Sequence, residues 1–210
     1  MRESPELPKS IRLPEPRHHG SVSLEAALRH RESIRDFGDA PLALGELSQL
    51  LWAAQGVTHG DGLRTAPSAG ALYPLEVYVV VGRVQDLEGG VYKYRPRAHQ
   101  LTRINEEDLR PALAAAALEQ TWMNESAALL VFSAVSERTT RKYGHRGIRY
   151  VHMEAGHAAQ NVFLQASALN IAAAVVGAFE DARVHRIMMM GAGEQVLYLM
   201  PVGRPARGRR

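Results

Sequence analysis

Residues 127–135 read AALLVFSAV, an apolar run that a single serine interrupts. Successive side chains of a β-strand point to opposite faces of the sheet, so a strand in which both sets are apolar is buried on both faces. The run therefore predicts a strand inside the core. LEVYVVV (75–81), which is rich in β-branched residues, and QVLYLMPVG (195–203) are predicted as further strands.

The rest of the chain reads as a mixed α+β pattern without an internal repeat. Further strands are predicted over 90–94 and 99–104, and 171–179 is predicted as a strand or a strand followed by a loop. Helices are predicted over 21–30, 45–55, 106–119, 148–169 and 181–190. Ser21 is the expected N-cap of the first helix, and Gly56 is the expected C′ residue of the second. Residues 57–74 form a long loop, and loops of this length inside a compact domain are usually functional.

The bulk properties exclude several classes of protein. The 210 residues suit one compact domain over 21–210, preceded by an extended, proline-rich arm over 1–20. The arm lacks the apolar centre of a signal peptide, and no apolar run reaches the roughly 18 residues of a membrane helix, which predicts a cytoplasmic protein. Because the chain has no cysteine, disulfides, cysteine-ligated zinc, iron–sulfur clusters and a thiol nucleophile are excluded.

Basic residues gather at the C-terminus, although the net charge is only +3. Arg204, Arg207, Arg209 and Arg210 lie within the last seven residues. A basic tail of this kind can bind nucleic acid. No aromatic-rich or helical reading surface accompanies it, which argues against a nucleic-acid-binding protein. Arginine forks equally suit the phosphate or carboxylate of a small ligand.

Several familiar motifs fail on their spacing. His152, Glu154 and His157 spell H-x-E-x-x-H, but the two histidines are five apart rather than four and so do not share a helix face. The pair Glu154–His157 has the spacing of a di-iron motif, which would have to occur twice. The glycines at 191 and 193 follow a helix and precede a strand, the reverse of a dinucleotide-binding turn. The sequence therefore predicts no metal site and no Rossmann domain.

RESIRDF (31–37) is a candidate phosphate site. If the preceding helix continues through it, Arg31 and Arg35 fall on one face with Ser33 between them, which suits a dianionic phosphate. The alternative is an ordinary solvated helix end, where arginines also interact favourably with the helix dipole.

Two further segments could approach a flat ligand. TAPSAGALYP (65–74) has small residues that admit a ligand close to the backbone, and Ser68 adds a hydroxyl. VVGAFED (175–181) ends an apolar stretch in small residues, where backbone N–H groups could face a ligand atom. A turn-rich loop and a plain strand-to-helix connection are the simpler interpretations. RTTRKYGHRGIRY (138–150) is too basic for the core and suits an anionic ligand, a substrate pocket or a subunit contact.

These segments together resemble the nitroreductase-like FMN-binding family, and most closely its branch of thiazoline and oxazoline dehydrogenases, the SagB-type oxidases. The resemblance rests on the order in which the segments occur over about residues 21–205. They are RESIRDF, LSQLLWAAQGVT, RTAPSAGALYPLEVY, GVYKY, RTTRKYGHRGIRYVHMEAGHAAQNVFLQASALN, VGAFED and LYLMPVGRP.

The resemblance implies an α+β fold with a central, mostly antiparallel sheet flanked by helices. It also implies an interlocked homodimer that binds FMN at the subunit interface, with the helix of Gln160 and Asn161 as the long dimer helix. The implied FMN contacts are Arg31, Ser33 and Arg35 on the phosphate and ribityl, Glu32 through its backbone, Pro67, Ser68, Ala69 and Gly70 along the flavin, Gly177 and Ala178 through their N–H groups at N5, and Arg207 or Arg209 at the phosphate.

The dehydrogenase branch uses a Lys-Tyr pair as acid and base on the substrate side, and Lys142-Tyr143 matches that pair. Removing hydride from a C–N ring also requires removing a proton, and an ammonium beside a tyrosine favours its phenolate. The sequence departs from the family at Ala71, where nitroreductases often have asparagine, and at Arg141 and Ile148, where relatives often have aromatic residues.

The departures leave the substrate open between nitro or quinone reduction and azoline oxidation, of a small molecule or a peptide, with NAD(P)H as a candidate electron donor. Two other classes remain as alternatives. One is a flavin-binding module without catalysis, and the other is the nucleic-acid-binding protein that the arginine tail alone would favour.

Overall fold

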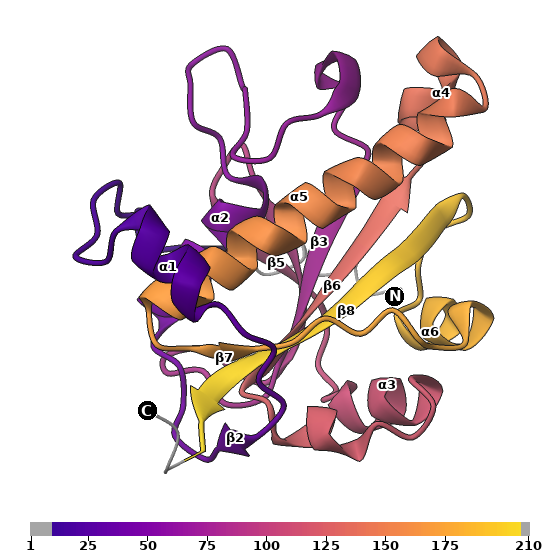
Figure 1. The fold of residues 1–210 in the computed structure, drawn as a ribbon. Helices are drawn as coiled ribbons and strands as arrows, with labels where there is room; N and C mark the ends of the chain where they lie inside the picture. The colour runs from indigo at the N-terminus through magenta and orange to yellow at the C-terminus, as the bar shows by residue number, and fades with distance from the viewer. Residues whose placement is uncertain (1–9, 207–210) are drawn as a thin grey trace, which may run out of the picture.

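The apolar run of the sequence forms β6 (Ala128–Val135), an inner strand of the sheet in the computed structural model (Figure 1). It pairs antiparallel with β3 (Leu75–Val81) on one side and with β8 (Glu194–Pro205) on the other. Leu130 faces one layer of helices and Leu129 faces the other. The prediction of a strand buried on both faces is confirmed.

The structure describes residues 10–206, which form an α+β fold with an antiparallel sheet in the order β1-β5-β4-β3-β6-β8-β2 and with β7 beside β8. The other strands are β1 (Ser10–Arg12), β2 (Phe37–Gly38), β4 (Gly90–Arg95), β5 (Gln100–Asn105) and β7 (Ala172–Ala173). The helices are α1 (Leu24–His30), α2 (Leu44–Gln55), α3 (Arg110–Ala116), α4 (Glu137–Tyr143), α5 (Arg146–Ala168) and α6 (Asp181–Ile187), with 3-10 turns η1 (Ala69–Ala71) and η2 (Thr121–Glu125).

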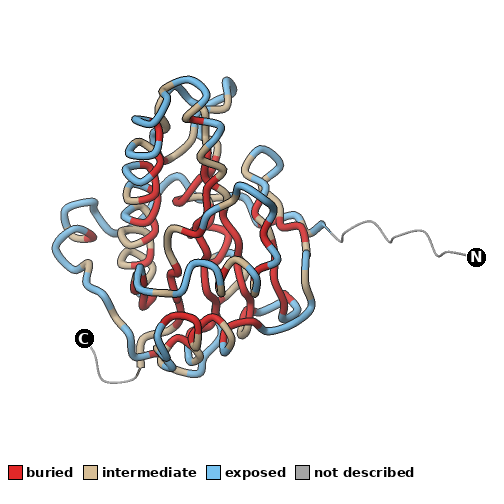
Figure 2. The backbone as a smooth tube through the Cα atoms, turned by 90° about the vertical axis from the view of Figure 1, so that its right-hand side faces the viewer, coloured by how far each residue is buried: buried red, intermediate tan, exposed pale blue. Residues whose placement is uncertain are grey.

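Helices cover both faces of the sheet. On one face α2 and α5 contribute the fully buried Leu50 and Val162, and on the other α3 and α6 contribute Leu113 and Val184. Figure 2 shows the buried residues gathered in the strands and along one side of the long helix. A fully buried side chain of this size stabilises the fold by about 1.5–3 kcal/mol. No helix in the part of the chain that the structure describes is long and apolar enough to cross a membrane.

Two predicted helix caps differ from the structure. α1 begins at Leu24 rather than at residue 21, because the hydroxyl of Ser23, and not that of Ser21, accepts the N–H of Ala26 at 3.1 Å. Gly56 ends α2, but with φ −63° it is not left-handed. A β-carbon at Gly56 would collide with the indole of Trp52, so close approach explains the glycine.

The helix predicted over 106–119 is shorter, and α3 covers only 110–116. The side chain of Asn105 accepts the N–H of Glu107, and that of Asp108 accepts the N–H of Arg110. These local bonds replace the helical ones, as Asn and Asp side chains often do. The strand predicted over 171–179 is likewise reduced to β7, after which the chain runs beside β8 and bonds it again at Val176, whose N–H and C=O both pair with Leu199.

The described part of the proline-rich arm, residues 10–20, lies along the surface of the domain. It adds the edge strand β1 to the sheet and then buries Leu13. The carbonyl of Pro14 accepts the hydroxyl of Ser48 at 2.6 Å. Further along, the side-chain amide of Gln49 bonds both the N–H and the C=O of Arg17. These contacts bring the arm to one side of α2 and α5.

Candidate active site

The 65–74 loop begins beside α2 and the C-terminal half of α5. The hydroxyl of Thr65 donates to the carbonyl of Trp52 at 3.0 Å, and the side chain of Asn161 donates to the carbonyl of Thr65 at 3.2 Å. Both ends of the loop also carry a proline, which restricts its backbone. The start of the loop is therefore held at two helices.

Tight turns shape the middle of this loop. Gly70, Ala71 and Tyr73 all have positive φ, at 64°, 53° and 47°. Non-glycine residues seldom adopt this conformation, so other contacts must hold it. Ser68 supplies two of them, because its carbonyl accepts the N–H of Ala71 at 3.0 Å and its hydroxyl accepts the N–H of Tyr73 at 2.9 Å.

Lys142 and Tyr143 meet the loop at Gly70. An ideal β-carbon on Gly70 would lie 2.8 Å from the Tyr143 hydroxyl and 3.1 Å from Lys142 Nζ. Both side chains come from the last turn of α4, which ends at Gly144 with φ 57°. Tyr150 packs edge-on against the Tyr143 ring at 5.2 Å. The structure thus brings together two segments that the sequence singled out separately, and we call them the loop half-site (residues 67–70, Lys142 and Tyr143).

Arg31, Ser33 and Arg35 do not share a helix face, because α1 ends at His30. The segment is extended instead, and Ile34 donates its N–H to the carbonyl of Ala173 in β7. The shared helix face that the sequence predicted for Arg31 and Arg35 is therefore absent.

Aromatic rings support the two arginines of this segment. The guanidinium of Arg31 lies over the ring of Phe163 at 5.4 Å, and that of Arg35 lies over the ring of Trp122 at 5.8 Å. Such stacking orients a guanidinium without using its N–H donors. Glu32 is exposed, and Glu32 and Phe163 both line a cavity.

The segment after β7 adds free backbone donors. Gly177 and Ala178 are exposed, and within residues 10–206 neither N–H has a hydrogen-bond acceptor. The N–H of Glu180 binds the carbonyl of Ala116, which fixes the end of the segment on α3. We call residues 31–35 with Gly177 and Ala178 the arginine half-site. Arg207 and Arg209 lie outside the described residues.

α1, which residues 31–35 follow, and α4, which carries Lys142 and Tyr143, lie toward opposite ends of α5 (Figure 1). Tyr150 contacts the loop half-site, whereas Phe163 contacts Arg31. At 1.5 Å per residue these two positions are about 20 Å apart along the helix axis. One chain therefore does not close both half-sites around a single small ligand.

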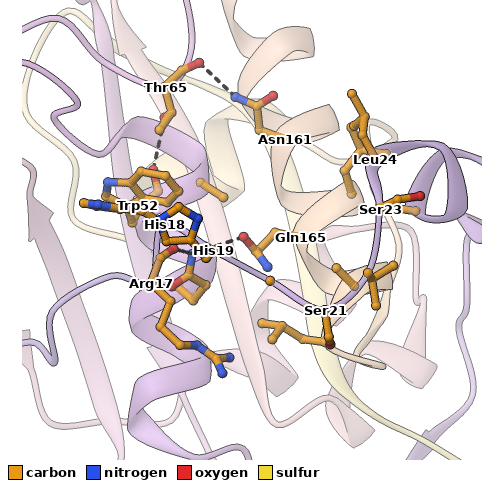
Figure 3. Close-up of a pocket in the computed structure, with 18 of the residues that line it drawn as sticks. Arg17, His18, His19, Ser21, Ser23, Leu24, Trp52, Thr65, Asn161 and Gln165 are labelled. Atoms are coloured by element: carbon orange, nitrogen blue, oxygen red, sulfur yellow. Dashed lines mark hydrogen bonds between the residues drawn. The ribbon is translucent and has the colours of Figure 1, made fainter.

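A cavity of about 630 Å³ lies between the arm, α2 and α5 (Figure 3). His18 stacks against Trp52 at 5.4 Å on one wall, and Gln165 and Asn161 of α5 form part of another. None of the predicted site residues lines it. His18 and His19 are both exposed and both line the cavity.

Glu154 is a buried carboxyl group that the sequence did not single out apart from metal binding. It lies on α5 and is only 2% exposed. Burial raises its pKa to about 7, while the Ser68 hydroxyl and the charge of Arg64 act in the opposite direction. The described residues contain no group of three or more His, Cys, Asp or Glu side chains that could hold a metal ion.

A model of the nitroreductase family matches residues 28–204, which include all the described half-site residues. The chain belongs to the nitroreductase family. It is therefore an oxidoreductase, and its α+β fold with a central antiparallel sheet is the nitroreductase fold that the resemblance implied.

Individual nitroreductase-family proteins agree with this membership. A nitroreductase homologue of Methanocaldococcus jannaschii is 49% identical over 87% of this chain and 91% of its own length. The microcin B17-processing protein of Escherichia coli is 30% identical over 61% of this chain, which spans about half (49%) of that relative. A crystal structure of a nitroreductase homologue from Ralstonia eutropha superimposes with a TM-score of 0.82 at 29% identity, covering 94% of this chain and 90% of the other.

Proposed function

We propose that this protein is an FMN-dependent oxidoreductase that works as a homodimer, with the arginine half-site of one protomer and the loop half-site of its partner around each flavin. The observation that carries the proposal is the separation of the two half-sites along α5. Each holds part of the chemistry that FMN needs, and a second copy in the opposite orientation can bring the missing half to each end.

The arginine half-site suits the phosphate and one edge of the flavin. Two guanidiniums and the Ser33 hydroxyl offer donors for a dianion. The free N–H groups of Gly177 and Ala178 can bind a ring acceptor such as N5. The last described residue, Ala206, binds the carbonyl of Asp36 at 3.1 Å. The chain therefore leaves the described region one residue from Arg35, which supports a tail arginine, Arg207 or Arg209, as a further phosphate ligand.

Large apolar side chains are exposed on α5 and on segments next to it in the sequence or the fold. They are Val22, Leu24, Leu28, Leu63, Ile148 and Met153. A second copy packed along α5 would bury side chains of this kind. A second copy is the occupant that would also complete the half-sites.

FMN bound there would supply a ring atom that accepts or donates hydride. The chain supplies the proton chemistry beside it. The Tyr143 hydroxyl can take or give a proton at the substrate, and the Lys142 ammonium lies beside it, 5.4 Å from the Tyr143 ring centroid. The 67–70 segment, whose turn Ser68 holds, would form one wall of the site.

Two substrate classes follow from this arrangement. The placement of Lys142 and Tyr143 at the loop favours oxidation of an azoline ring, in which a proton and a hydride both leave. The relatives that are named as microcin B17- and trifolitoxin-processing proteins support this choice. Reduction of nitro or quinone compounds with NAD(P)H as the electron donor is the second candidate, and the similarity over nearly the full length of the archaeal nitroreductase homologue supports it.

The first test is the visible absorption spectrum of the purified protein, followed by release and identification of any chromophore. We expect a flavin spectrum, FMN in the supernatant and a dimer by light scattering. A colourless protein that does not take up added FMN would overturn the proposal. A flavin that no electron donor or substrate reduces would favour the non-catalytic flavin-binding module instead.

A further inference from the structure

Glu154 carries a buried charge that the proposed reaction does not use. Its neighbours on α5, His152 and Met153, are exposed, whereas Glu154 is 2% exposed and points beneath the 65–74 loop. Its Oε1 is buried and has no hydrogen-bond partner among the described residues. A buried carboxylate without full pairing costs folding free energy. Such a cost at a loop beside the candidate site calls for a function.

The contact with Ser68 links Glu154 to the shape of the loop. The Ser68 hydroxyl acts on the Glu154 carboxyl group, whose pKa it lowers against the effect of burial, and it also accepts the N–H of Tyr73 at 2.9 Å. A hydroxyl has one proton to donate. Because the oxygen accepts from Tyr73, the proton of the hydroxyl is available for the carboxylate. Donation of that proton to the carboxylate would fix the orientation of the hydroxyl and so the direction in which its oxygen faces Tyr73.

Arg64 also contacts Tyr73 and acts on Glu154. Its guanidinium lies over the Tyr73 ring at 4.3 Å and donates to Gln55 Oε1 at 2.8 Å, and its charge acts on Glu154. The two groups that act on Glu154, Ser68 and Arg64, thus both contact Tyr73. Tyr73 has a positive φ angle, which needs such support.

The other charged groups around this part of α5 have partners elsewhere. Glu76, at the start of β3, pairs with Lys93 at 3.2 Å and with Arg138. Lys142 and Tyr143, from α4, lie across Gly70 from the loop. Arg64 is therefore the cation that acts directly on Glu154 among the described residues.

We propose that Glu154 is a positioning residue, which acts through the Ser68 hydroxyl to hold the 67–70 segment in the shape that meets the flavin on one side and Lys142-Tyr143 on the other. The inference rests on the proposed function for its flavin contact only. The role of Glu154 in holding the loop is a property of the chain without any ligand. The ionised carboxylate accepts a stronger hydrogen bond than a neutral carboxyl or amide, so the loop is held best when Glu154 is ionised.

Hydrogen exchange of segment 65–74 in the flavin-free protein tests the proposal directly. The comparison is between wild type and Glu154→Gln at the same pH, so that the intrinsic pH dependence of exchange cancels. Because the pKa of Glu154 is about 7, we expect the variant to exchange about tenfold faster above about pH 8 and at the wild-type rate below about pH 6. The exposed Glu119→Gln is the matched control, with wild-type exchange throughout.

Equal exchange of wild type and Glu154→Gln at both pH values would overturn the proposal, and so would a difference that does not change with pH. Circular dichroism establishes whether the variant folds. If it does not, Ser68→Ala carries the test, because it removes the hydroxyl through which Glu154 acts. Above about pH 8, segment 65–74 must then exchange faster in Ser68→Ala than in wild type. Equal exchange of the two proteins would contradict the inference.

Titration with FMN adds a second readout. We expect the Kd of Glu154→Gln to exceed that of wild type about tenfold above about pH 8 and to equal it below about pH 6. Combining Glu154→Gln with Ser68→Ala must give less than the sum of the two effects, since both act on one contact. If neither protein binds FMN, the proposed function fails while the exchange result still decides the role of Glu154.

Discussion

The Tyr143 hydroxyl lies 2.8 Å from the place that a β-carbon on residue 70 would occupy, so the approach of α4 to the 65–74 loop requires glycine there. The backbone of Gly70 favours glycine as well, because its φ of 64° is left-handed. No other described glycine has both a left-handed backbone and the Lys142-Tyr143 pair against it.

Gly70→Ala is therefore expected to move the Lys-Tyr pair away from the loop. The left-handed backbone alone costs about 1 kcal/mol for alanine, and the contact with Tyr143 adds to it. We expect a fall in kcat of at least about tenfold with a small loss of thermal stability. Gly45→Ala on α2 is the control, because a β-carbon there meets nothing within 4 Å. Wild-type turnover by Gly70→Ala would contradict the close approach.

The Lys-Tyr contact also shows how far the sequence could lead. Loop 65–74 and the basic segment 138–150 were each predicted as functional from their composition, and the structure brings them together at Gly70. Their spatial relationship could not be predicted from the residues alone, because it depends on where α4 ends and how the chain turns at Gly144.

The strands were predicted better than the helix ends. The apolar runs of β3, β6 and β8 encode burial directly, and all three form where they were expected. The starts of α1 and α3 depended instead on which of several capping side chains binds the backbone, and Ser23 and Asp108 decided them. Glu154 was missed because its partner Ser68 is far away in the sequence.

Leu130→Ala in β6 is expected to destabilise the fold by about 2–5 kcal/mol, since the side chain is fully buried among α2, α5 and the neighbouring strands. Chemical denaturation with an unchanged m-value would measure it. Leu118→Ala, at an exposed position after α3, is the matched control with a change near zero. A loss below about 1 kcal/mol for Leu130→Ala would contradict the buried position of β6.

Stability is expected to fall as the pH rises from about 5 to 8, through the titration of Glu154. The raised pKa of about 7, against an ordinary value of 4.5, means that the folded protein binds the proton more tightly than the unfolded chain does. Folding stability therefore declines with rising pH until Glu154 is ionised, by an amount on the order of 3 kcal/mol. Glu154→Gln should remove this decline in denaturation experiments across the pH range, and a parallel pH profile would contradict it.

This loss of stability has the opposite sign to the effect on the loop. Ionised Glu154 weakens the fold as a whole but accepts the Ser68 hydroxyl more strongly. Glu154→Gln should therefore be the more stable protein at high pH and yet have the looser 65–74 loop. A trade of stability for a positioned site is common where a charge is buried for function.

Tyr143→Phe separates the two substrate classes. Removing the hydroxyl deletes the proposed acid and base, so we expect azoline oxidation to fall by about 10²–10⁴-fold in kcat with little change in flavin affinity. Quinone reduction with NAD(P)H should change much less. Tyr150→Phe is the matched control, since its ring packs on Tyr143 and remains in place. Equal losses for both substrates would show that the hydroxyl acts on folding or on the flavin rather than on the substrate proton.

Mixing two inactive variants tests whether each flavin is shared between protomers. Arg35→Ala damages the arginine half-site and Lys142→Ala damages the loop half-site, and because α5 separates them by about 20 Å neither change should disturb the other half-site. In a mixed dimer one site receives both substitutions and the other receives neither. Activity and tight FMN binding should therefore reappear when the two variants are unfolded together and refolded. A sample of the double variant treated in the same way is the control and should stay inactive. If each flavin were bound by one protomer alone, the mixture would be no more active than the two variants measured separately. That result would contradict the shared site and would leave the family membership unchanged.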